Sequence, residues 1–154
     1  MPNMTEELNK ILVPAASWAE ESERKILETG VALNSAQLAD AASIGVTNAE
    51  RVRLLRVDRI PAPTHPILRQ ANQQYRLISD DTGALTVRYG IFVRSDCSGQ
   101  RQLLAHELVH VMQYERFNGF REFLQAYISE ILAPPGYPHG PLEREAIRIA
   151  TKYV

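Results

Sequence analysis

Apolar residues recur at helical spacing along much of the chain, and helix start and stop signals flank these stretches. Ser17 begins a capping box, Gly30 and Gly45 supply stops, and a proline opens two of the stretches. The pattern predicts helices over about 18–28, 35–45, 66–75, 101–117 and 120–132, and a last helix that opens at Pro141.

A strict alternation of apolar and polar residues over 85–94 predicts one strand, with Leu85 and Ile91 on the same face. Gly90 inside it indicates a bulge or a close backbone approach. A second strand is predicted within 51–60, ending at Pro61, although a capping pattern at 47–50 also allows a helix there. The expected fold is a single α+β domain over 1–154, with a small mixed or antiparallel sheet packed on helices.

Composition narrows the possible classes of protein. A chain of 154 residues with 45% hydrophobic residues can bury close to 70% of its unfolded surface, which suits one globular domain. The net charge of −1 argues against a nucleic-acid partner. No stretch approaches the roughly 20 apolar residues of a membrane span, and the first residues are acidic where a secretory signal is basic, so we expect no membrane partner and a cytoplasmic location. Cys97 is alone, which excludes an internal disulfide.

The chemistry centres on His106-Glu107-Leu108-Val109-His110, inside the predicted helix 101–117. Residues i and i+4 of a helix lie about 40° apart, so His106 and His110 present two imidazoles on one face. Glu107 is rotated by about 100° and is placed to reach a metal-bound water as a general base. Zinc suits such a site. The competing interpretation is that His106 and His110 are ordinary residues of an amphipathic helix. A third histidine, His65, lies in a Pro-rich loop and is predicted to face solvent.

A third protein ligand is expected downstream, and four residues there qualify: Glu130, His139, Glu143 and Glu145. Glu145 has Arg148 at i+3, so a surface ion pair explains it. Glu143 has only small and apolar neighbours along its helix face, which favours a cation supplied by another helix. Glu130 also lacks a basic partner and remains the alternative.

Over about 91–150 the chain resembles the zincin metallopeptidases of the gluzincin branch. The resemblance rests on the string 106–110 followed by Gln113, and on the later segment 142–146. This resemblance implies that a glutamate on a later helix completes a zinc site. The thermolysin-like spacing falls on Glu130, but Pro134 stands where that pattern has an aspartate. The pattern of CAAX-type and related small metallopeptidases falls on Glu143, with Ile147 in place of the aspartate that usually orients a ligand histidine.

Residues and resemblance together predict a zinc-dependent metallopeptidase that acts on a peptide or protein substrate. The metal polarises the carbonyl, and Glu107 carries the proton to the leaving amine. Tyr137 and His139 are candidate oxyanion donors, and Tyr127 is a third. Two alternatives stay open: a non-catalytic metal-binding interaction protein with a zincin-like fold, and a hydrolase that cleaves a single protein.

Overall fold

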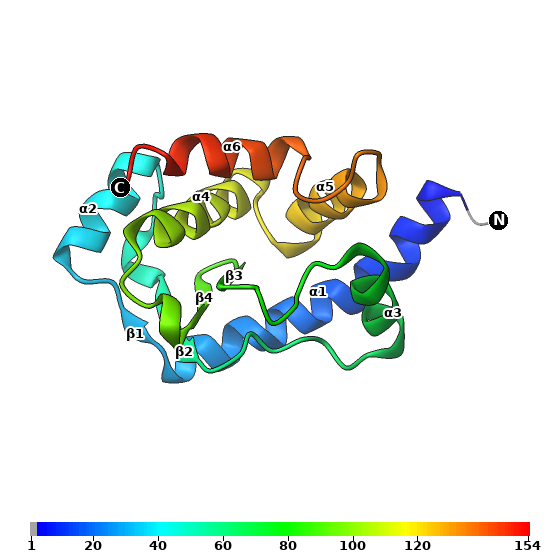
Figure 1. The fold of residues 1–154 in the computed structure, drawn as a ribbon, viewed down its shortest axis with the longest axis horizontal. Helices are drawn as coiled ribbons and strands as arrows, with labels where there is room; N and C mark the ends of the chain where they lie inside the picture. Colours follow the sequence, from blue (N-terminus) through cyan, green and yellow to red (C-terminus); the bar gives the residue numbers. More distant parts are fainter. Residues whose placement is uncertain (1–2) are drawn as a thin grey trace.

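The computed structural model describes residues 3–154, which form six α-helices and a small four-stranded mixed sheet (Figure 1). This confirms the expected α+β class. The elements are α1 (Met4–Thr29), β1 (Val31–Ala32), α2 (Ser35–Ile44), the 3-10 turn η1 (Ala49–Arg51), β2 (Arg53–Val57), α3 (Pro66–Tyr75), β3 (Ala84–Val87), β4 (Gly90–Arg94), the 3-10 turn η2 (Ser95–Cys97), α4 (Arg101–Phe117), α5 (Phe120–Leu132) and α6 (Pro141–Ala150). Across residues 3–154, no helix combines the length and the apolar character that crossing a membrane requires.

Helix α1 is longer than the sequence pattern predicted. It begins at Met4, because the side chain of Asn3 accepts a hydrogen bond from the backbone N–H of Glu6 at 2.8 Å. The predicted start at the Ser17 capping box was wrong. Pro14 lies inside the helix, where it removes one backbone donor. The buried residues Ile11 and Leu12 on the same segment offset this cost by packing against the rest of the protein.

The other predicted helices are confirmed, and their ends follow local signals. A capping box joins Asn34 and Gln37 at the start of α2, and Gly45 ends that helix in the left-handed conformation, with φ 112°. Pro66 and Pro141 occupy first-turn positions of α3 and α6. The predicted strand within 51–60 is confirmed as β2, which follows the short turn η1.

The predicted single strand over 85–94 was wrong, because the chain reverses there into the hairpin β3–β4. Arg88 adopts a left-handed conformation with φ 61°. The buried carboxylate of Glu23 on α1 holds this turn, accepting hydrogen bonds from the Arg88 guanidinium at 2.7 Å and from the backbone N–H of Tyr89 at 3.1 Å. Gly90 makes the close approach that its place in the pattern indicated, since a Cβ there would lie 3.0 Å from the side chain of Ile26.

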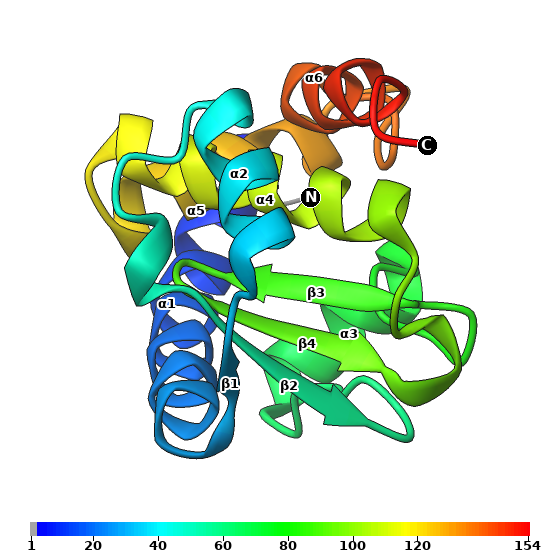
Figure 2. The same cartoon turned by 90° about the vertical axis from the view of Figure 1, so that its left-hand side faces the viewer.

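The sheet has the strand order β1-β2-β4-β3, with β2 and β4 parallel and the other pairs antiparallel. Helices cover both faces (Figure 2). On β4, Phe92 packs in one cluster with Ile26 of α1, and Ile91 packs in another with Leu108 of α4. Because β3 comes last in the strand order, it forms an edge of the sheet. Helix α4 packs against it. This arrangement sets the histidine pair of α4 beside β3.

Candidate metal centre

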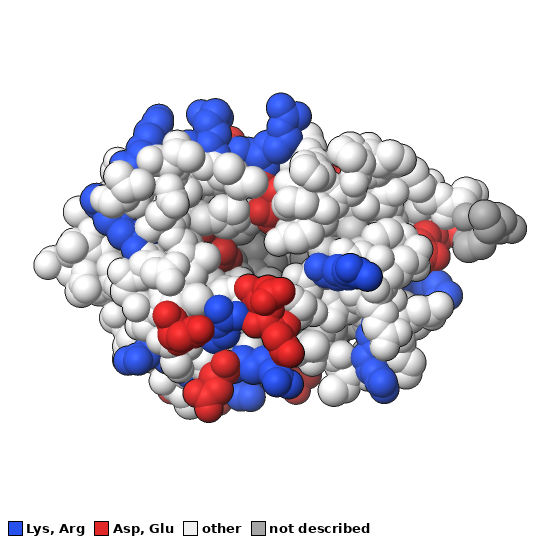
Figure 3. All heavy atoms as spheres, viewed as in Figure 1, with Lys and Arg blue, Asp and Glu red and all other residues white. Residues whose placement is uncertain are grey.

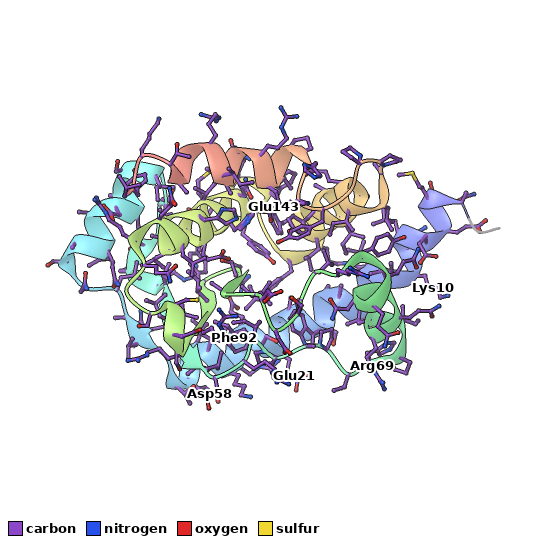
Figure 4. The ribbon with its side chains drawn as sticks, viewed as in Figure 1. Lys10, Glu21, Asp58, Arg69, Phe92 and Glu143 are labelled. Atoms are coloured by element: carbon purple, nitrogen blue, oxygen red, sulfur yellow. The ribbon has the colours of Figure 1, made fainter. Side chains whose placement is uncertain are left out.

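Two helices bring together three residues that can hold a metal ion. His106 and His110 lie on α4, and Glu143 lies in the first turn of α6, which packs along α4. One carboxylate oxygen of Glu143 is 2.9 Å from Nε2 of His106, and the other is 3.1 Å from Nε2 of His110. The candidate ligand atoms all lie within 4.8 Å of one another. Figure 4 labels Glu143 between the two helices.

Hydrogen bonds and charge favour the ionised forms of His110 and Glu143 against the effect of burial. Burial by itself lowers the pKa of His110, but the hydrogen bond and the charge of Glu143 outweigh it and raise that pKa to about 9. Burial by itself raises the pKa of Glu143, but hydrogen bonds with His106 and His110 hold it well below its ordinary value. Glu143 thus stabilises the protonated form of His110, and a metal ion would compete with that proton for Nε2.

The donor set fits a transition metal of the zinc type. Two imidazole nitrogens and one carboxylate are ligands that zinc accepts, and catalytic zinc sites use three protein ligands with a fourth position for water or substrate. His106, His110 and Glu143 supply three such ligands.

Tyr127 on α5 holds the carboxylate of Glu143, the candidate ligand. Its hydroxyl donates to Oε2 of Glu143 at 2.5 Å, and its ring lies edge-on to His110 with the centroids 6.0 Å apart. Burial, and then the charge of Glu143, raise the pKa of Tyr127 well above its ordinary value, so the hydroxyl keeps its proton. Sequence reasoning gave Tyr127 only as an oxyanion donor. In the structure its hydroxyl positions Glu143.

Glu107 lies beside the metal group without belonging to it. Its side chain is buried and lines the same cavity as His106, His110 and Glu143. The hydroxyl of Thr86 on β3 donates to the Glu107 carboxylate at 2.9 Å and also contacts its backbone oxygen at 3.1 Å. Sequence reasoning missed Thr86, because this contact joins two elements that no local pattern relates.

Gln113 is a second residue whose part only the structure reveals. Its side chain is fully buried, and its amide oxygen lies 2.8 Å from Nδ1 of His110. The amide NH₂ donates to the backbone oxygen of Leu142 at 3.0 Å and to Glu145 at 2.8 Å. The amide oxygen therefore accepts from Nδ1–H, so Nε2 is the nitrogen of His110 that faces Glu143 and could bind a metal. Gln113 is thus placed to orient His110, whereas Ile147, which stands where the resemblance expects an orienting aspartate, is 46% exposed.

Replacing Gln113 with leucine is expected to weaken zinc binding by about 10- to 100-fold, because His110 loses the partner that fixes its ring. Competition with a chromophoric chelator measures this change. Gln125→Leu, at an exposed position of α5, is the control that keeps full affinity. Circular dichroism establishes that each variant is folded, and unchanged affinity in folded Gln113→Leu would contradict the orienting role.

Glu145 forms a different ion pair from the predicted one. Its carboxylate pairs with Arg116 of α4 at 2.7 Å, and not with Arg148 on its own helix. The hydrogen bond from Arg116 lowers the pKa of Glu145. Because Glu145 also accepts from Gln113, it anchors the amide that orients His110.

Glu130 lies outside the His106, His110 and Glu143 group. Its carboxylate accepts from the backbone N–H of Leu142 at 2.9 Å and so caps the start of α6. Gly140 makes room for this contact, since a Cβ there would lie 2.6 Å from a carboxylate oxygen of Glu130. The geometry therefore favours Glu143 as the third ligand.

The other two predicted oxyanion donors, Tyr137 and His139, have different surroundings. Tyr137 lines the cavity, and burial followed by the charges of Glu143 and Glu107 raises its pKa to about 12, so its hydroxyl stays a donor. His139 is exposed and is not part of the cavity wall. The structure thus brings Tyr137 to the site and leaves His139 away from it.

The remaining histidine and the cysteine also lie away from the metal group. His65 caps α3, where its Nδ1 accepts from the backbone N–H of Ile67 at 3.2 Å. Cys97 is buried in η2 near Arg94 and Asp96.

Comparison of the chain with protein-family models, with curated proteins and with solved structures found no match. The zincin family and fold that the resemblance implies therefore stay predictions.

Proposed function

We propose that this protein is a zinc-dependent metallopeptidase of the gluzincin type, with a zincin-like fold. One observation carries the proposal: His106, His110 and Glu143 converge in a cavity whose wall also holds the buried carboxylate of Glu107. Three metal ligands beside an independent carboxylate are what hydrolysis by an activated water requires. A peptide or protein is the proposed substrate, and the cytoplasm is the proposed location.

The metal position would be held by His106, His110 and Glu143. When bound there, zinc supplies a Lewis acid and brings the pKa of a coordinated water down to about 7. The protein orients its ligands through the hydrogen bonds from Tyr127 to Glu143 and from His110 to Gln113. These fixed contacts reduce the reorganisation that binding and reaction demand.

The proton transfers are assigned to Glu107. Its carboxylate accepts a proton from the attacking water and later donates it to the amine that leaves. The hydroxyl of Thr86 holds this carboxylate by donating to one oxygen, which leaves the second oxygen for the water. Tyr137 is the proposed donor to the developing oxyanion, because it lines the cavity with a hydroxyl that keeps its proton.

The test begins with protein stripped of metal by a chelator. We expect it to take up about one zinc per chain, because the residues of one site converge. We also expect zinc addition to start hydrolysis of a mixed peptide library, with products identified by mass spectrometry. Magnesium is the control ion and restores no activity, because it prefers oxygen ligands in an octahedron. Absence of zinc uptake would contradict the proposal at its first step.

A further inference from the structure

A cavity of about 190 Å³ extends from the metal group into the N-terminal part of the protein. The metal end carries His106, His110 and Glu143, and α1, α3, α5 and β3 contribute most of the wall beyond them. Figure 3, in the view of Figure 1, shows a hollow near the centre of this face, between α4 and α6 on one side and α1 and α3 on the other.

The far end of the cavity is apolar. Ile11 of α1, Leu68 of α3 and Ile128 of α5 are buried there and form one cluster of the core. Trp18 and Ala71 pack against the same cluster and also line the cavity. A ligand that reached this end would exchange water for aliphatic and aromatic contacts.

Three polar side chains of the wall, those of Asn72, Thr82 and Thr86, form hydrogen bonds within the protein. The amide of Asn72 bonds to both backbone groups of Ile78, at 2.8 and 3.0 Å. The hydroxyl of Thr82 accepts from the backbone N–H of Ser79 at 2.9 Å, and the hydroxyl of Thr86 donates to Glu107. These three side chains therefore direct their hydrogen bonds to protein partners. A wall whose polar groups are already bonded suits an apolar ligand group.

The size of the cavity suits one large side chain. An apolar cavity of about 150 Å³ stays dry and takes up benzene. About 190 Å³ therefore holds an aromatic ring or a leucine or methionine side chain, with its backbone near the metal end.

From these observations we infer that the cavity receives a large apolar side chain of the substrate, on a residue next to the scissile bond. The inference rests on the proposed function and adds a substrate class to it. Two of the deep walls, on α1 and α3, belong to residues 4–75, outside the segment 91–150 that resembles metallopeptidases. The N-terminal half of this chain therefore shares the selectivity with α5.

Two zinc-binding probes test the inference on the zinc-loaded protein: N-acetyl-phenylalanine hydroxamate and N-acetyl-alanine hydroxamate. Each offers the same group to the metal, and they differ only in the side chain that the cavity would receive. We expect calorimetry to find the phenylalanine probe bound about 10- to 100-fold more tightly, because its ring leaves water. Trp18 is the only tryptophan and lines the cavity, so its emission should change with the phenylalanine probe alone.

Filling the cavity should remove this preference. Ala71→Phe on α3 and Ala15→Leu on α1 each place a larger side chain in the cavity, from different helices. If one variant fails to fold, the other still tests the inference. We expect both to bring the phenylalanine probe close to the affinity of the alanine probe, while the alanine probe itself still binds. Gln74→Phe, at an exposed position of α3, is the matched control and keeps the preference.

The outcomes separate the two proposals. Equal affinities for both probes on zinc-loaded wild type would overturn the apolar pocket and leave the metal site standing. A preference that survives in both folded cavity variants would place the ring elsewhere and also overturn it. Failure of zinc and of both probes to bind would overturn the metal site, and the inferred pocket with it.

Discussion

Glu107→Gln is expected to lower kcat/KM for peptide hydrolysis by about 10²- to 10⁴-fold, the usual contribution of a positioned general base. Glutamine has nearly the same shape but cannot accept the proton of the attacking water. Its amide oxygen still accepts from Thr86, so the fold and the zinc content should not change. Hydrolysis rates and elemental analysis of the same preparations measure both quantities.

Glu20→Gln, at an exposed position of α1, is the matched control for this substitution. Full activity in Glu107→Gln would remove Glu107 from the mechanism. Zinc-loaded wild type that hydrolyses no peptide, yet binds a partner equally well with and without this substitution, would support the alternative of a non-catalytic interaction protein.

Glu143→Ala is expected to weaken zinc binding by more than about 100-fold, since loss of an outer partner alone costs 10- to 100-fold. Glu130→Ala is its matched comparison, because both residues were candidates for the third ligand. We expect Glu130→Ala to keep its zinc and to lose about 1 kcal/mol of stability, the usual cost of a missing helix cap. Chelator competition and thermal unfolding separate the two effects.

The opposite result has a definite meaning. If Glu130→Ala lost zinc while Glu143→Ala kept it, the third ligand would follow the thermolysin-like spacing. Glu143 would then contact both histidines only in the metal-free protein.

Features encoded by neighbouring residues could be predicted from the sequence. The histidine pair needs only helical spacing, and α4 begins and ends at the predicted residues. Pro66 and Pro141 mark the starts of α3 and α6, because proline costs little in a first turn. Local physics was sufficient for these elements.

Features that depend on distant residues could not be predicted. The alternation over 85–94 continues through the hairpin, and the turn at Arg88 is held by Glu23, which lies 65 positions earlier. Glu130 and Glu143 looked alike because each lacked a basic neighbour along its helix. The structure separates them, since one carboxylate faces a backbone N–H and the other faces two imidazoles.

The division of the metal group between two helices affects how long an ion stays bound. Two of the three candidate ligands lie on α4, which contributes several fully buried side chains to the core, whereas Glu143 lies on the shorter helix α6. Local opening of one helix requires less free energy than global unfolding. A brief detachment of α6 would remove one ligand while the histidines stay in place. The dissociation rate of the ion would then be governed by the local stability of residues 141–150.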